Sequence, residues 1–413
     1  MSTPHPSPTV SGVRAEPAPR PRRVRLSGID LARGLAVLGM VAVHSLNDYN
    51  DDGKPTLSYT LSAGHASAMF AVLAGVAIAF LSGRRRVARG PASYGTAASL
   101  AARAAVIGVI GLSLGYTDID YGAVILPYYA VMFLLAVPLV YLSTRTLAVL
   151  ATVAAVATPV LSQLVRPHLG EAFTRQLSWE TLLQRPFGTV GNILFTGEFP
   201  AVVWMTYVIV GLVVGRLDLS SVRVNGVLAG VGAFLTTLSA TISWMFLHPF
   251  EGLAHLQAVS DSDTVDEILT FGADGTVPTD TWWWLTVSNP HTGTPLDLMA
   301  TIGSSLLVLG LCLLLFQVGT PLLARTVRIV TAPLVAIGTM SLTVYVGHIM
   351  FVNSDFDMYD PWSGYLRQVV VMCVFAVAWR ATAGRGPLEG LVTAITKRVR
   401  RWVESRTGPV SSA

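Results

Sequence analysis

The first apolar segment of the chain carries three ionisable side chains that could do acid–base chemistry. Asp30, Arg33 and His44 all lie within GIDLARGLAVLGMVAVHSLNDYN, whose middle is otherwise typical of a membrane-spanning helix. Ionisable groups inside such a helix are costly and usually face a cavity or a partner. A neutral imidazole, with an ordinary pKa of about 6.5, can remove a proton from a hydroxyl or an amine. His44 is therefore a candidate catalytic base.

The spacing of these residues predicts one polar stripe along the helix. At about 100° per residue, Arg33 and His44 project within roughly 20° of one another and lie about 16 Å apart along the axis. Asp30 lies one turn before Arg33 and could orient its guanidinium group. A structural interpretation stays open, because Asp30 could complement the helix N-terminus and Arg33 could anchor the helix at the inner membrane surface.

Three further side chains are expected at the same depth as His44. His65 lies about two turns into the second apolar segment, His348 ends a later one (GTMSLTVYVGHIM), and Asp297 begins another (TPLDLM). These residues predict an outer group of three imidazoles and one carboxylate. His348 or Asp297 could hold the tautomer of His44 or bind the acceptor. Each histidine could equally be a packed residue with a satisfied ring.

A basic set is expected at the opposite, inner end of the helices. Arg33 is joined there by Arg84, Arg85 and Arg103. Planar guanidinium groups match phosphate oxygens, so this set predicts a site for the phosphates of a nucleotide cofactor. The alternative for the RRR run at 84–86 is topology alone, since positive charge stays inside during membrane insertion.

The elements that position these residues follow from the composition. Of the 413 residues, 52% are hydrophobic and 13% are charged, which is too apolar for an ordinary soluble domain. Runs of about 20 apolar residues, each long enough to cross a ~30 Å hydrocarbon core, recur along the chain. We predict an all-α, polytopic transmembrane helix bundle of about ten spans: 29–48, 59–82, 97–116, 121–142, 146–165, 199–216, 224–247, 296–318, 329–352 and 364–382.

The linkers alternate in charge, which predicts the topology. Basic linkers follow the even-numbered spans, so both termini should be cytoplasmic in a protein of the plasma membrane. The long segments 166–198 and 249–295 then lie outside, where long ordered loops often carry function. The basic residues at helix ends indicate topology, and we expect no nucleic-acid partner.

Three regions are expected along the chain. Residues 1–24 are rich in Pro, Ser and Arg and predict a disordered cytoplasmic tail, with no cleaved signal peptide. Residues 25–392 form the membrane domain, and 393–413 form a basic amphipathic tail along the inner surface. Cys312 and Cys373 both lie in apolar segments without metal-ligand spacing, so we expect neither a disulfide nor a metal site.

Six segments of the chain are distinctive when taken together. They are GIDLARGLAVLGMVAVH, GHASAMFAVLAG, TGEFPAVVWMTYVIVGLVVGRLDL, NPHTGTPLDLMATIG, GTMSLTVYVGH and GRGPLEGL. These segments resemble the bacterial YeiB-like membrane family, which is similar to the heparan-α-glucosaminide N-acetyltransferase catalytic domain and, more distantly, to acyltransferase-3 membrane proteins. The resemblance covers roughly residues 25–392.

The resemblance implies a transmembrane acyltransferase. Such an enzyme takes an acetyl or other short acyl group from cytoplasmic acyl-CoA and places it on a sugar or lipid-linked glycan across the bilayer. In the acyltransferase-3 group a histidine that ends the first helix is the catalytic base, and His44 matches that position. In the heparan enzyme the key histidine lies in the following loop, and here that loop, NDYNDDGKPTLS, contains none. This departure argues against a covalent acetyl-histidine and favours His44.

These observations combine into one hypothesis with two rivals. Acyl-CoA docks from the cytoplasm with its phosphates near Arg33 and Arg103, and its thioester reaches His44 through a tunnel in the bundle. The first rival is a transporter or flippase for an envelope lipid or small metabolite, in which the histidines relay protons. The second is a scaffold whose polar stripe locks helices together. The acceptor, the acyl chain and the oligomeric state stay open.

Overall fold

The structure is a computed structural model, and it describes residues 26–170, 172–317 and 319–407. In this described part the secondary structure is helical, apart from one isolated bridge between Tyr49 and Pro55. The predicted all-α class is therefore confirmed, whereas the predicted tail 1–24 lies outside the described residues. The elements are α1 (Ser27–Ser45), α2 (Leu57–Ser62), α3 (His65–Leu81), α4 (Pro91–Ser113), η1 (Ile119–Tyr121), α5 (Leu126–Leu139), α6 (Thr144–Val165), η2 (Arg166–His168), α7 (Trp179–Gln184), α8 (Pro186–Gly191), η3 (Asn192–Thr196), α9 (Ala201–Arg216), α10 (Val222–Leu247), α11 (Gly252–Val259), α12 (Ser262–Phe271), η4 (Trp282–Thr286), α13 (Pro295–Leu315), α14 (Pro321–Val330), α15 (Ala332–Thr339), α16 (Ser341–Val352), α17 (Pro361–Thr382) and α18 (Pro387–Thr407).

The number of spans is smaller than expected. Among the described residues, seven helices are long and apolar enough to cross a membrane, or up to nine if each of two bent helix pairs is one span. The span predicted at 121–142 contains only the 14-residue helix α5. The span predicted at 329–352 is divided at Met340, where α15 ends and the separate 12-residue helix α16 begins. At the start of this span α14 and α15 meet at 56°, and Pro333 in the first turn of α15 explains that bend, since proline lacks the N–H that a continuing helix requires.

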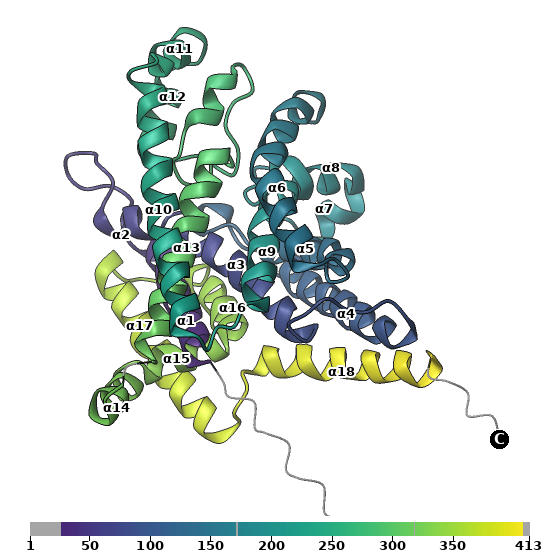
Figure 1. The fold of residues 1–413 in the computed structure, drawn as a ribbon. Coiled ribbons are helices and arrows are strands. Elements are labelled where there is room, and N and C mark those ends of the chain that lie inside the picture. The colour runs from purple at the N-terminus through teal and green to yellow at the C-terminus, as the bar shows by residue number, and fades with distance from the viewer. Residues whose placement is uncertain (1–25, 171, 318, 408–413) are drawn as a thin grey trace, which may run out of the picture.

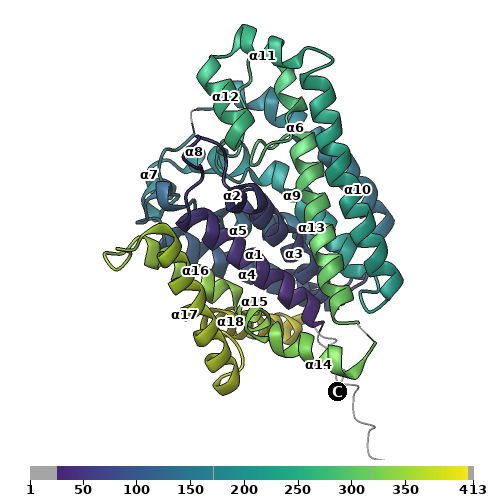
Figure 2. The same ribbon diagram turned by 90° about the vertical axis from the view of Figure 1, so that its left-hand side faces the viewer.

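Helix α1 lies in the middle of the bundle, between α13 on one side and α15, α16 and α17 on the other (Figure 2). Glycines allow the backbones to approach closely. A Cβ at Gly34 would overlap the Leu334 carbonyl on α15, and a Cβ at Gly211 of α9 would overlap the Val72 carbonyl on α3. The small residues in these helices therefore act as close-packing positions, as in other membrane bundles, and they provide a rigid frame for the polar residues of α1.

Residues 393–407 of the tail predicted at 393–413 belong to α18, which packs along α4 and lies beneath it in Figure 1, whereas 408–413 lie outside the described residues. Glu389, in the first turn of α18, reaches the N-terminus of α16. Its carboxylate accepts hydrogen bonds from the Leu342 N–H (2.7 Å), the Thr343 N–H (3.2 Å) and the Thr343 hydroxyl (2.6 Å). An anionic group satisfies the unpaired N–H groups at a helix start and suits its positive dipole. This contact joins α18 to the helix that carries His348.

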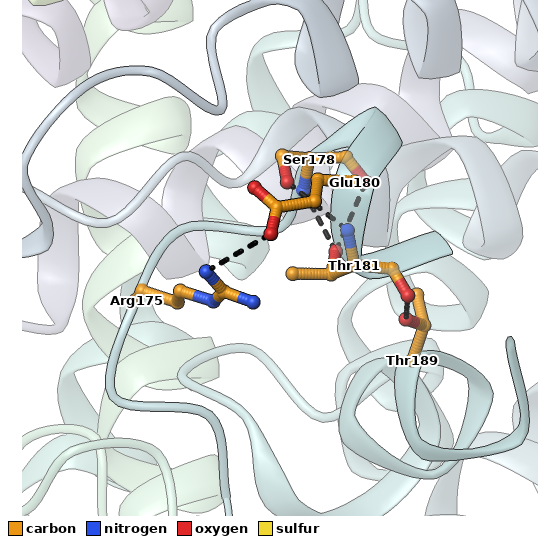
Figure 3. A network of polar contacts seen from close by, with 5 residues as sticks. All are labelled: Arg175, Ser178, Glu180, Thr181 and Thr189. Carbon is orange, nitrogen blue, oxygen red and sulfur yellow. Dashed lines mark hydrogen bonds and ion pairs between the residues drawn. The ribbon is translucent and has the colours of Figure 1, made fainter. Parts of the chain in front are cut away.

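The long segment between α6 and α9 is folded by short-range polar contacts (Figure 3). Ser178 and Thr181 form a capping box at the start of α7, and the Thr189 hydroxyl donates to the Thr181 carbonyl at 2.8 Å. The predicted loop 166–198 is therefore an ordered segment of short helices. Its Gln176 is buried against the rest of the bundle.

Candidate active site

His44 and His348 meet at the end of α1. The Nδ1 atom of His44 lies 3.0 Å from the Nε2 atom of His348, and the two ring planes are within 6° of parallel. The other nitrogen of His348, Nδ1, lies 2.7 Å from the amide oxygen of Gln368 on α17. The Gln368 amide nitrogen in turn donates to the Ser45 hydroxyl at 3.0 Å. Of the predicted outer group, these two histidines are the pair that the fold brings into direct contact.

The direction of these hydrogen bonds determines where the protons lie. A carbonyl oxygen can only accept, so Nδ1 of His348 carries a proton and donates it to Gln368. Nε2 of His348 is then an acceptor, and Nδ1 of His44 donates to it. Nε2 of His44 is left with a lone pair that can take a proton. The series Gln368–His348–His44 therefore holds the His44 imidazole in one orientation and one tautomer, as a general base would require.

A turn without a side chain lies beside this imidazole. A Cβ at Gly122 would lie 2.8 Å from Nε2 of His44, and the φ of Gly122 is 134°, a value that favours glycine. Gln176 fixes the turn, because its amide accepts from the Val124 N–H (3.0 Å) and donates to the Gly122 carbonyl (2.7 Å). Any larger residue at position 122 would press on Nε2 of His44.

The other two predicted outer residues have different neighbours. His65 hydrogen-bonds through Nδ1 to the Ser304 hydroxyl on α13 at 2.8 Å. Asp297 accepts from the Gly293 N–H at 2.9 Å, and its own N–H donates to the Thr294 hydroxyl at 3.0 Å. Asp297 therefore folds the start of α13. Its Oδ1 atom is buried without a partner in the described part of the chain.

His291 is a candidate that the sequence reasoning did not single out, although it lies in the NPHTGTPLD segment. Its φ is 56°, in the left-handed region, and its ring stacks on Trp204 with centroids 6.1 Å apart. Burial, followed by the nearby His65, lowers the pKa of His291 to about 4. His291 is therefore neutral at cell pH.

A cavity of about 1070 Å³ lies between the inner parts of α1, α3, α4, α5 and α16. This volume suits a small-molecule or cofactor site. The predicted basic residues Arg33, Arg84 and Arg103 line it together, whereas Arg85 is exposed and outside the lining. Its charged lining residues are Asp30, Arg33, Arg84, Arg103, Arg385 and Glu389.

The charged lining residues have different surroundings. Arg33 lies 3.5 Å from the Asp30 carboxylate, as the sequence predicts. The Arg103 guanidinium lies 5.9 Å from the centre of the Phe133 ring. Arg84 donates to the carbonyls of Gly215 (3.3 Å) and Leu217 (2.6 Å) at the end of α9, so it also closes that helix. The excess of guanidinium groups fits a ligand that carries several negative charges.

The cavity does not reach the histidine pair. Its lining residues at the outer end include Met40, Ile125, Tyr129 and Tyr345, and neither His44 nor His348 is among them. Met40 precedes His44 by one helical turn, or roughly 6 Å along the axis. The predicted continuous tunnel is therefore closed in this structure by a thin wall of side chains.

The chain also matches a known family. Residues 25–245, just over half of the chain, match the family described as heparan-alpha-glucosaminide N-acetyltransferase, catalytic. The matched region includes α1, α3 and α4, which supply Arg33, His44 and Arg103. A search of curated proteins finds no match.

Proposed function

Because the chain belongs to the heparan-alpha-glucosaminide N-acetyltransferase catalytic family, we propose that it transfers an acetyl group from acetyl-CoA to a sugar or other cell-envelope acceptor. Membership indicates a membrane acetyltransferase. The finer assignment of donor, acceptor side and residues rests on the geometry. With the basic helix ends on the cytoplasmic side, the cavity opens toward cytoplasmic acetyl-CoA and the histidine pair faces the opposite side.

The residues at one end of α1 bind the cofactor, and those at the other end transfer the proton. Arg33 and Arg103 bind the phosphates of CoA, and Asp30 orients Arg33. His44 removes a proton from the acceptor hydroxyl or amine through Nε2, because its Nδ1 is committed to His348. The acceptor atom then attacks the thioester carbonyl carbon, the C–S bond breaks, and His44 returns the proton to the departing thiolate.

The observation that carries this function is the hydrogen-bonded series from Gln368 through His348 to His44. A base at a helix end with a fixed tautomer is what acyl transfer to a hydroxyl or amine requires. A scaffold requires no such free nitrogen.

The test is transfer of labelled acetyl from acetyl-CoA in reconstituted membranes, with glucosamine and total envelope glycans as acceptor probes. We expect label in the acceptor with the native chain and a loss of at least a hundredfold with His44→Ala. His168→Ala changes an exposed histidine outside the site and should label normally. Absence of labelling with the native chain, or full labelling with His44→Ala, would contradict the assignment.

A further inference from the structure

Two tyrosines belong to the wall between the cavity and the histidine pair. Tyr345 lies one turn before His348 on α16, and its hydroxyl accepts a hydrogen bond from the Ile125 N–H at 3.2 Å. Tyr129 lies on α5, is only 8% exposed and also lines the cavity. A thioester that travels from the inner arginines to His44 has to pass between these side chains.

The hydroxyl of Tyr129 has no evident structural task. It is buried and has no hydrogen-bond partner in the described part of the chain. Leaving such a group unpaired is destabilising, and buried polar groups without partners are rare in native proteins. The adjacent Tyr128 is the contrast, because its hydroxyl donates to the Asn192 side chain at 3.1 Å.

We propose that Tyr129 and Tyr345 form the subsite for the acyl group of the thioester, with the Tyr129 hydroxyl as donor to its carbonyl oxygen. This assignment rests on the proposed acetyl-CoA reaction. Tyr129 lines the same cavity as Arg33 and Arg103. It also lies one turn after Ile125, whose N–H contacts Tyr345, the residue one turn before His348. The Tyr345–Ile125 hydrogen bond is the part of the wall that gives way when the acyl group enters.

The chemistry explains why a donor is needed at this point. When the acceptor atom bonds to the carbonyl carbon, negative charge gathers on the carbonyl oxygen before the C–S bond breaks. A fixed O–H group aimed at that oxygen stabilises the charge, and removal of one such donor in other enzymes costs about 10²–10³ in rate. Tyr129 would therefore be a catalytic residue, whereas Tyr345 positions the wall.

The experiment compares Tyr129→Phe with the native chain in lipid nanodiscs. Binding of acetyl-CoA and of CoA without an acyl group is measured by calorimetry, and CoA thiol release is measured with glucosamine as acceptor. We expect unchanged CoA affinity, loss of any preference for acetyl-CoA over CoA, and turnover reduced by at least tenfold. Tyr141→Phe removes a hydroxyl that donates to the Ser93 carbonyl (3.4 Å) outside the cavity, and it should behave as the native chain.

The outcomes separate this subsite from the reaction itself. If the native chain turns over and Tyr129→Phe matches it in turnover and in acetyl-CoA preference, the subsite is wrong and the acetyltransferase assignment stands. If the native chain binds neither CoA nor acetyl-CoA, both the acyl subsite and the acetyltransferase assignment are wrong. If Tyr129→Phe weakens CoA and acetyl-CoA equally, the hydroxyl supports the fold of the cavity and the subsite is again wrong.

Discussion

The inner and outer ends of α1 differ in how closely their polar side chains are held together. At the inner end a cavity of about 1070 Å³ is lined by Arg33 of α1, Arg103 of α4, and Arg84 and Arg385 of connecting segments. At the outer end His44, His348 and Gln368 are joined by contacts of 2.7–3.0 Å. Binding a flexible anion needs charge and room, whereas a base needs one nitrogen in one position. We therefore expect inner substitutions to change affinity and outer substitutions to change turnover.

The largest effect is expected from Gly122→Val. The new side chain would press on Nε2 of His44 and should lower kcat by at least a hundredfold, without changing CoA affinity. The control is Gly53→Val, which places the same residue at another left-handed position (φ 73°) with no neighbour within 4 Å. Equal losses in both variants would show that backbone strain, and not contact with the imidazole, is responsible.

A smaller loss is expected from Gln368→Leu. Without the amide oxygen, His348 has no partner to fix its tautomer, and His44 spends less time with Nε2 free. A lost hydrogen bond between neutral groups in such a series is worth about 1–2 kcal/mol, so kcat should fall by roughly 5- to 30-fold at constant KM. Gln368→Glu keeps an acceptor and should restore most of the activity. A rise in KM without a fall in kcat would contradict the orienting role.

At the inner end, Arg103→Met should raise the KM for acetyl-CoA by about tenfold with little change in kcat, because one charge-assisted contact to phosphate is lost. Arg85→Met is the matched change, since Arg85 is exposed and outside the cavity lining. Kinetics at several acetyl-CoA concentrations distinguish the two. An effect of Arg85→Met as large as that of Arg103→Met would argue for general attraction of the anion.

The smallest effect that we expect is a change in how the free energy of unfolding depends on pH. The pKa of His291 is lowered to about 4 in the folded chain, so the unfolded chain binds more protons between pH 4 and 6.5, and stability falls as the pH falls through this range. Between pH 7 and pH 6 this contributes roughly 0.7 kcal/mol. Asparagine tolerates a positive φ, so His291→Asn is a suitable variant. In thermal unfolding scans it should lose less stability between pH 7 and pH 6 than the native chain. An unchanged pH slope would contradict this role.

The polar residues of the spans could be recognised from the sequence, because charge inside an apolar helix is costly and therefore informative. Helical spacing placed Asp30 beside Arg33, and depth placed His348 near His44. Neither rule could separate His348, which contacts His44, from His65, which contacts Ser304. That distinction depends on how the helices rotate and pack, which spacing within one helix does not determine.

The sequence did not predict the neutral amide groups of the site, the helix breaks or the wall of side chains, each for a different reason. Gln368 and Gln176 carry no charge, so they do not stand out in an apolar helix or a loop. Fewer spans were found than predicted because hydrophobic run length does not register where helices end: the run at 329–352 is divided at Met340, between α15 and α16, and the run at 121–142 holds the 14-residue helix α5. The closed wall at Tyr129 and Tyr345 consists of ordinary bulky side chains, and only packing reveals it.

The contact between Glu389 and α16 has a consequence for biosynthesis. The Glu389 carboxylate lies 46 residues after Thr343 in the chain, so its hydrogen bonds to the start of α16 can form only once that later part of the chain has been synthesised. Gln368, the partner of His348, likewise follows it by 20 residues. The contacts that hold α16 and His348 in place are therefore among the last that synthesis makes possible.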